Sequence, residues 1–331
     1  MKLISIVLAT YNGEKYLQQQ LDSISSQTHK NIELIIGDDN SSDKTIDILN
    51  NFSTNYPLKV VLSEQNIGFV KNFERILSMC SGDYIAFCDQ DDVWLPNKLE
   101  VLIDAIKDYE CVHSDAFLID QNGRTFSQSY SNYSGKICLP NRLIDLAFNG
   151  CVTGCTMLVK RSLVMESLPF PEGLDVHDRW IGALSYSRQS LAYVEVPLIK
   201  YRQHQNNSIG AFDVNRKSST IVKTWLNQNY KNLFLVKQKF FTDCHKQSNF
   251  LRIFSKRFRC QLADKELRDL NLAENLFGRL SRKECSFRDL FIIIKLSPYF
   301  NVNKPNQFRL LYMLSLCRIV LILSMKKGLI R

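Results

Sequence analysis

Three aspartates directly follow an apolar run in the segment IAFCDQDDVW, residues 85–94. At this spacing Asp89, Asp91 and Asp92 repel one another, and their pKa values rise unless a cation or hydrogen-bond donors offset the repulsion. Residues two apart in extended backbone point to the same side, so Asp89 and Asp91 are expected to present their oxygens together. Such oxygens suit Mg²⁺ or Mn²⁺, ions that also bind substrate phosphates. The segment therefore predicts a metal site for a phosphorylated ligand.

A structural interpretation of the same aspartates is also open. A helix is expected over residues 95–107, just after them, and the positive end of its dipole attracts anions. One aspartate would serve that purpose and three exceed it, so we favour the metal site. Trp94 is expected to be a core aromatic beneath it.

The elements that must position this site alternate along the chain. Strands are expected at residues 3–9, 32–37, 58–62 and 84–88, and helices at 14–26, 44–52, 67–79 and 95–107. Such alternation is typical of a parallel sheet covered on both faces, whose ligands bind at the carboxyl ends of the strands. Residues 10–12, 38–42 and 89–92 all follow strand ends, so we predict that they form one site.

Beyond residue 109 the alternation becomes irregular. Strands are expected at residues 111–119, 154–159 and 191–196, and helices at 139–148 and 178–186. From about residue 214 onward Lys, Arg, Leu and Phe are frequent and β-branched runs are few, which indicates a mainly helical region. We predict an α/β domain over residues 1–210 and a basic, helical region over residues 211–331.

Charge is distributed unequally between these two parts. Residues 1–210 contain 18 Lys and Arg against 25 Asp and Glu, a net charge of −7, whereas residues 211–331 contain 24 against 8, a net charge of +16. The basic part indicates either solvated helix faces or contact with an anionic membrane surface. We expect no nucleic-acid partner.

Cysteine usage and hydropathy bear on the compartment. Ten cysteines are scattered without C-x-x-C pairs, which indicates a reducing environment. Residues 1–12 lack the apolar core and cleavage site of a signal peptide, and the longest apolar run, residues 310–324, is interrupted by Arg318. We predict a cytoplasmic protein with a peripheral contact to the inner face of the cytoplasmic membrane.

Four sets of residues resemble family 2 glycosyltransferases of the GT-A fold, and are most similar to bacterial rhamnosyltransferases that build surface polysaccharides such as O antigen and capsule. They are SIVLATYNGEKYLQQQLDSISSQT, IIGDDNSSDKT, DYIAFCDQDDVWLPNKLE, and HDRW followed by KYRQHQNNSIG. The resemblance covers roughly residues 1–210. It implies a Rossmann-like mixed sheet flanked by helices, and inverting transfer of a sugar from a nucleoside diphosphate to a hydroxyl group.

The resemblance also assigns residues to the sugar donor. Asp39 would accept a hydrogen bond from the base, Tyr11 would line the base and ribose, and Lys71 would be a cation near the donor. The full set of donor-binding residues is Thr10, Tyr11, Glu14, Asp39, Lys71, Asp89 and Gln90. Two structural alternatives remain, because Asp39 could cap the helix near residue 44 and Lys71 could be a solvated surface side chain.

For the metal, the resemblance implies Asp91 as a ligand and Asp89 nearer the ribose or a metal-bound water. His204, in YRQHQNN, would approach the metal or the diphosphate, although a single histidine is more often structural. The implied ion is Mg²⁺ or Mn²⁺, which offsets the charge that builds on the departing nucleoside diphosphate.

Inverting transfer needs a base that removes the proton of the acceptor hydroxyl, and the resemblance places Asp178 of the HDRW segment in this role. The alternative is a helix N-cap. Many relatives have Glu before this Asp, whereas this chain has His177, which changes the charge beside the base. Arg179 is a candidate partner for Asp178.

The resemblance implies dTDP-L-rhamnose as donor, with UDP-galactose, UDP-glucose and UDP-N-acetylhexosamine left open, and a saccharide or lipid-linked saccharide as acceptor. Two rival functions remain. DQDDV also fits the D-x-D-x-[TV] pattern of haloacid-dehalogenase-like phosphohydrolases, although that pattern normally follows the first strand and three strands precede it here. The other rival is a non-catalytic binding protein that retains the nucleotide site.

Overall fold

The computed structural model describes residues 2–135, 138–205, 207, 238–286, 288–299, 316–317 and 319–320. Its strands are β1 Ile4–Thr10, β2 Ile32–Asp38, β3 Leu58–Leu62, β4 Tyr84–Asp89, β5 Val93–Trp94, β6 Cys111–Ile119, β7 Thr125–Ser127, β8 Met157–Lys160 and β9 Leu191–Arg202. The helices before residue 210 are α1 Leu17–Ser25, α2 Thr45–Asn51, α3 Phe69–Leu77, α4 Lys98–Ile106, α5 Tyr130–Ser134, α6 Leu143–Phe148, α7 Arg161–Ser167 and α8 His177–Ser187. Later helices are α10 Gln238–Arg257, α11 Asp264–Ser281 and α12 Asp289–Leu296, and η1 Gly154–Thr156, η2 Arg259–Gln261 and η3 Ser297–Tyr299 are short 3₁₀ helices.

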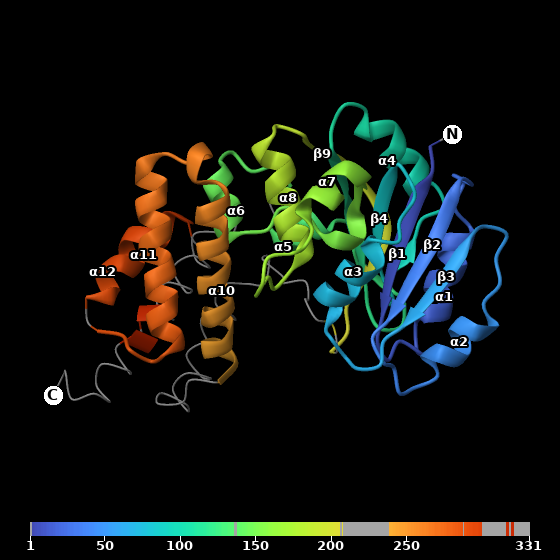
Figure 1. Cartoon of the computed structure of the whole chain (residues 1–331), viewed down its shortest axis with the longest axis horizontal. Helices are drawn as coiled ribbons and strands as arrows, with labels where there is room; N and C mark the ends of the chain where they lie inside the picture. The colour runs from blue at the N-terminus through green and yellow to red at the C-terminus, as the bar shows by residue number, and fades with distance from the viewer. Residues whose placement is uncertain are drawn as a thin grey trace.

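The strands form one mixed sheet in the order β3-β2-β1-β4-β8-β6-β9-β5, with β7 paired to β6. Strands β1 to β4 are parallel to their neighbours among themselves, and β8 enters antiparallel between β4 and β6. Figure 1 shows this sheet at one end of the molecule and α10 to α12 at the other. The predicted architecture, a mixed sheet flanked by helices with a helical C-terminal region, is confirmed.

Alternation along the central strands divides the apolar side chains between two faces of the sheet. In β1, Ile6 and Leu8 pack toward α1 and α4, while Val7 packs on the opposite face with α3. Neighbouring strands follow the same rule, as Ala86 and Phe87 of β4 show. Both faces are thereby covered, and the carboxyl ends of the strands are left for ligands.

The second half of the sheet differs from the expectation in several places. The strand expected at residues 191–196 continues to Arg202, and the one expected at 154–159 begins with the 3₁₀ turn η1. Strands β5 and β7 and helices α5 and α7 were not expected. These elements have two to seven residues, which is too short for local periodicity to identify them.

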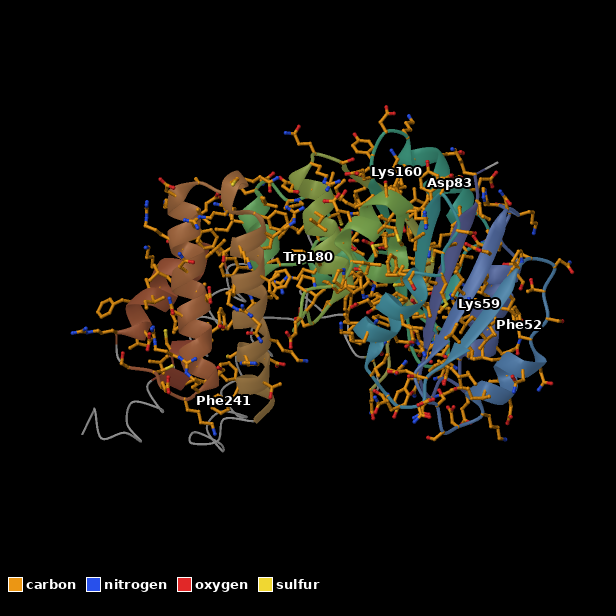
Figure 2. The ribbon with its side chains drawn as sticks, in the orientation of Figure 1. Phe52, Lys59, Asp83, Lys160, Trp180 and Phe241 are labelled. Atoms are coloured by element: carbon orange, nitrogen blue, oxygen red, sulfur yellow. The ribbon has the colours of Figure 1, made fainter. Side chains whose placement is uncertain are left out.

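The C-terminal helices share a core with the sheet. Trp180 of α8 packs against Phe258, the residue after α10, with ring centroids 5.8 Å apart, and Figure 2 shows Trp180 between the sheet and α10. The expected boundary at residues 210–211 and most of the apolar run at 310–324 lie outside the described residues. Within the described ranges, no helix has both the length and the apolar character needed to cross a membrane.

Candidate active site

A cavity of about 1040 Å³ lies at the carboxyl ends of the parallel strands. Its walls come from the ends of β1 and β4, the segment before α3, the α6–η1 loop, the first turn of α8 and the chain after β9. Eight predicted site residues line it: Thr10, Tyr11, Asp39, Asp89, Gln90, Asp91, Asp178 and His204. Segments far apart in the sequence therefore meet where the sequence analysis placed the site.

Asp38 fixes the floor of the cavity. Its buried carboxylate accepts hydrogen bonds from the Thr10 hydroxyl at 2.7 Å, from the Ser41 amide at 2.8 Å and from the Ser41 hydroxyl at 2.6 Å. These bonds tie the turn after β2 to the end of β1. Thr10 thus lines the cavity with its hydroxyl already committed to the scaffold.

Asp39 orients the neighbouring wall. Its two carboxylate oxygens accept from the amides of Ile67 and Gly68, each at 2.8 Å. Gly68 has a φ of 84°, a conformation that glycine adopts without the steric penalty of a side chain. The carboxylate thereby holds the segment before α3 against the strand ends. The expected bond to a nucleotide base stays a prediction, since each oxygen can accept more than one hydrogen bond.

Gln90 joins the ends of β4 and β1. Its amide accepts from the Tyr11 N–H and donates to the Tyr11 carbonyl, both at 2.9 Å. A Cβ on Gly13 would lie 2.2 Å from Gln90 Oε1, so a side chain at Gly13 would displace this amide. The structure gives Gln90 a scaffolding function beside the role in donor binding that the resemblance implied.

Glu14 and Lys71 are not brought to the cavity. Glu14 accepts from the Lys44 amide at 3.1 Å, next to α2, although its neighbours Gly13 and Lys15 line the cavity. Lys71 lies on α3 with its side chain 56% exposed and pairs with Glu74 at 3.0 Å. Neither residue lines the cavity, so their assignment to the donor stays a prediction without support from the cavity lining. Lys15 lines the wall instead.

The carboxylates after β4 lie close enough to affect one another. Burial, followed by the charges of Asp91 and Asp178, raises the pKa of Asp89 to about 7. The expectation of extended backbone was wrong here, because the chain turns at Gln90 and Asp91 directly after β4. Asp91 faces the same cavity through this turn, and its Oδ2 lies 2.8 Å from His204 Nε2.

Asp92 points into the protein behind the cavity. It is fully buried, and its carboxylate accepts from the Arg202 amide at 2.9 Å. Ligand-type atoms of Asp89, Asp92 and Cys155 all lie within 4.8 Å of one another. Burial raises the pKa of Cys155 well above its usual range, so this residue is a thiol and a weak ligand. The carboxylate oxygens are the hard donors that suit Mg²⁺ or Mn²⁺.

A buried lysine lies beneath these carboxylates. Lys98 Nζ donates to the Cys155 carbonyl at 2.7 Å and lies 3.2 Å from the centroid of the Trp94 ring. Burial lowers its pKa to about 8, and charges that include those of Asp92 and Asp89 oppose this shift. Trp94 is a core aromatic, as the sequence indicated, and it also forms the surface on which this cation rests.

Arg202 is a second buried cation that the sequence analysis missed. Its Nε donates to the Asp91 carbonyl at 2.7 Å and its Nη2 to Gln19 Oε1 at 2.6 Å. The guanidinium also lies 4.5 Å from the Tyr16 ring, on which His204 stacks at 5.2 Å. Arg202 therefore fixes the turn that carries Asp91. It lies in the quoted KYRQHQNNSIG segment, but its role was not assigned, since its partners come from segments 111 and 183 residues away.

Asp178 stands in the first turn of α8 and lines the cavity. Its Oδ2 accepts from the Gly154 amide at 2.9 Å. The N-cap of α8 is Val176, so Asp178 is not the cap residue that the structural alternative proposed. Arg179 was expected as its partner, but its guanidinium donates to the carbonyls of Leu146 and Ala147 at the end of α6.

His177 is neutral at neutral pH. Its ring packs among aromatic side chains, with centroids 4.5 Å from Phe73 and 4.9 Å from Phe87, and neither ring nitrogen has a hydrogen-bond partner among the described residues. Burial lowers its pKa to about 4 although the charge of Asp178 opposes the shift. The histidine therefore adds no positive charge beside Asp178 at neutral pH.

Comparison with known proteins agrees with this geometry. The model of the family described as Glycosyl transferase family 2 matches residues 5–167. Over 250 residues the chain is 30% identical to the dTDP-rhamnosyl transferase RfbG of Shigella flexneri, covering 71% of this chain and 80% of that protein. This chain therefore belongs to glycosyl transferase family 2 and is a glycosyltransferase.

Two further similarities extend this result. The chain is 29% identical over 216 residues to the UDP-Glc:alpha-D-GlcNAc-diphosphoundecaprenol beta-1,3-glucosyltransferase WfgD of Escherichia coli, covering 62% of this chain and 79% of that protein. The crystal structure of S. aureus TarS 1-349 in complex with UDP-GlcNAc superimposes with a TM-score of 0.54 at 18% identity, covering 99% of this chain and 92% of that one. The second similarity shows the GT-A fold. Neither supports the phosphohydrolase interpretation.

Proposed function

We propose that this protein is an inverting, divalent-metal-dependent transferase that moves L-rhamnose from dTDP-L-rhamnose to a hydroxyl of a saccharide or lipid-linked saccharide during surface polysaccharide synthesis. One observation carries the proposal. Asp89, Asp91 and Asp178 line a single cavity at the strand ends, and the charges of the other two help to raise the pKa of Asp89. This concentration of negative charge fits a metal ion and a base on either side of one reacting sugar.

Asp178 would act as the base. The Gly154 amide holds one of its oxygens, which orients the carboxylate toward the cavity. A carboxylate placed this way removes the proton of an acceptor hydroxyl as that oxygen attacks the anomeric carbon from the face opposite the leaving group. The packed neutral ring of His177 excludes water from one side of the helix turn that carries this base.

Asp89 and Asp91 would hold the ion, with Asp92 behind Asp89 and His204 steadying Asp91. A bound Mg²⁺ or Mn²⁺ supplies positive charge against the departing nucleoside diphosphate. The protein's own contribution is to keep this turn rigid, and Arg202 does so through the Asp91 carbonyl.

The donor assignment rests on similarity. RfbG is named as a dTDP-rhamnosyl transferase, and this supports dTDP-L-rhamnose. The names of WfgD and of the TarS complex contain UDP-sugars, so UDP-glucose and UDP-N-acetylglucosamine are the main competitors, with UDP-galactose beside them. A cavity of about 1040 Å³ is large enough for a nucleoside diphosphate sugar together with part of an acceptor.

Release of nucleoside diphosphate from a panel of these four donors tests the proposal. The assay contains purified protein, Mn²⁺ or EDTA, and acceptors comprising octyl glycosides of common hexoses and a synthetic N-acetylglucosamine diphosphate lipid. We expect the fastest release from dTDP-L-rhamnose, with Mn²⁺ only. Faster turnover of a UDP-sugar would overturn the donor assignment. Metal-dependent nucleotide binding without turnover of any donor would favour the binding-protein alternative.

A peripheral contact with the cytoplasmic face of the membrane is the second part of the proposal. Phe291 and Ile294 on α12 are 67% and 56% exposed, and Arg288 and Lys295 stand beside them in a region of strongly positive net charge. Apolar side chains flanked by cations suit an anionic interface. We expect co-sedimentation with anionic vesicles at low salt and less at high salt. Equal recovery with neutral vesicles, or none with either kind, would contradict the contact.

A further inference from the structure

The loop between α6 and η1 connects the proposed catalytic base, Asp178, with the C-terminal helices. Asn149 and Gly150 at its start line the cavity, and Gly154 at its end donates its amide hydrogen to Asp178. A Cβ on Gly150 would lie 3.8 Å from Arg179 Cγ, so the loop also runs close to the residue after the base. Contacts that hold the start of this loop therefore also help to hold Gly154, the hydrogen-bond partner of Asp178.

A side chain from α10 fixes that start. Gln247 Nε2 donates to the Ala147 carbonyl at 3.1 Å, and Gln247 Oε1 accepts from Arg179 Nη1 at 3.3 Å. Arg179 in turn donates to the carbonyls of Leu146 at 3.2 Å and of Ala147. Its cation stands at the negative end of α6, where the helix dipole favours it. Gln247 thus joins α6 and α8 at one point.

Three more contacts from the C-terminal helices support the loop and the ends of α6 and α8 beside it. Asn149 Nδ2 donates to the Tyr299 carbonyl at 3.2 Å, and the Phe148 and Tyr299 rings stack with centroids 5.2 Å apart. The Arg179 guanidinium lies 3.7 Å from the centroid of Phe250 on α10. The wall of the cavity next to the base is therefore supported from outside the sheet.

We propose that Gln247 is a positioning residue for sugar transfer, holding residues 149–154 and Arg179 so that Asp178 meets the acceptor hydroxyl. This inference rests on the proposed function for the role of Asp178. Asp178 and Arg179 are adjacent on α8, so a displacement of Arg179 also displaces the proposed base Asp178. Transfer between two bound substrates is sensitive to small displacements, whereas the donor residues at the strand ends have their own hydrogen bonds.

The test compares three variants. Gln247→Met keeps the length of the side chain and removes both hydrogen bonds, whereas Gln247→Glu keeps the acceptor for Arg179. Gln261→Met is the matched control, because Gln261 is exposed in η2. For the octyl glycoside that the unmodified enzyme uses fastest, we expect kcat/KM to fall about tenfold in Gln247→Met and to recover partly in Gln247→Glu. Hydrolysis of the donor by water and the KM for the donor should change by less than about twofold.

Parallel losses of transfer and hydrolysis, or no change in transfer, would overturn the inference. Hydrogen–deuterium exchange separates it from the proposed function. In Gln247→Met, amides of residues 147–154 should exchange faster while those of residues 66–72 do not, and Gln261→Met should resemble the unmodified chain. If no donor is turned over at all, the proposed function fails. The exchange experiment then still shows whether Gln247 holds residues 147–154 in place. Unchanged exchange at residues 147–154 in Gln247→Met would contradict the positioning role of Gln247.

Discussion

The proposed function divides the cavity into a donor side at the ends of β1, β2 and β4 and an acceptor side around Asp178 and the loop before η1, and the two are held in place differently. On the donor side, Asp38, Asp39 and Gln90 bind backbone groups within the first ninety residues, at the ends of neighbouring strands. On the acceptor side, the loop before η1 depends on Gln247 and Tyr299, which lie 100 and 150 residues from their partners. If the proposed function is right, the half that binds the nucleotide is fixed by the sheet itself, and the half that binds the acceptor by the helices added to it.

The largest expected effect falls on the acceptor side. Asp178→Asn should lower the transfer rate about 10³-fold, because the variant lacks a base, while the amide oxygen still accepts from Gly154. Initial rates with saturating donor measure this. Asp104→Asn, on the exposed face of α4, serves as the control and should keep full activity. A loss below tenfold would remove Asp178 from the role of base.

On the acceptor side, the buried ring of His177 should make the stability of the protein depend on pH. Its folded pKa of about 4 lies below the ordinary value of 6.5, so the unfolded chain takes up the proton first as pH falls. Stability is then present above pH 6.5 and is lost toward pH 4, by about 3 kcal/mol in all. Among the charged groups in the described ranges, Asp178 is the one that opposes this shift, and Phe69, Phe73 and Phe87 surround the ring.

His177→Phe should remove this part of the stability loss at low pH and keep the aromatic packing. Urea unfolding between pH 4.5 and 7.5 measures it. His245→Phe, at an exposed position on α10, should leave the slope of stability against pH as it is in the unmodified chain. An equal acid slope in His177→Phe would show that the buried ring does not cause the loss.

On the donor side, Asp91→Asn should abolish the metal-dependent part of nucleotide binding. A ligand at one hundred times its Kd stabilises a protein by about 2.7 kcal/mol, and this gain should vanish for dTDP with Mn²⁺ in the variant. Thermal melting with dTDP, in Mn²⁺ or EDTA, measures the difference. An unchanged Mn²⁺-dependent shift would place the metal on other residues, with Asp92 as the next to be replaced.

The smallest expected effect concerns Lys71. Since its side chain is exposed and pairs with Glu74 outside the cavity, Lys71→Ala should change the donor KM by less than about twofold. Lys15→Ala is the variant to compare with it. Because Lys15 lines the cavity, this substitution should raise the donor KM more than Lys71→Ala does. A larger effect from Lys71→Ala than from Lys15→Ala would assign Lys71 to the donor, as the resemblance implied.

Much of the donor side could be predicted from the sequence, because its residues follow apolar strands directly. Asp39 and Asp89 were placed at strand ends, where the structure has them. The two buried cations could not be predicted. Lys98 resembles a solvated helix residue until the Cys155 carbonyl, 57 residues away, is brought against it. Arg202 likewise gains its partners only when β9 extends beside β6.

The acceptor side was predicted only in part. Asp178 was identified through the HDRW segment, but its partner was not, because Gly154 reaches it through the fold and Arg179 is drawn to the end of α6. Gln247 carried no signal at all, since it lies beyond the residues that resemble the family. Contacts that depend on how distant helices dock leave no trace in local patterns of hydrophobicity or charge.

The apolar core that runs from β4 through α8 into α10 and α11 makes the folding of the two parts interdependent. A chain ending at residue 210 would leave Trp180 and the apolar face of α8 in water, and such patches promote aggregation. Heating the full chain should accordingly give one calorimetric transition whose enthalpy matches that of a single cooperative unit. We therefore expect that removal of the C-terminal helices would leave no freestanding catalytic sheet.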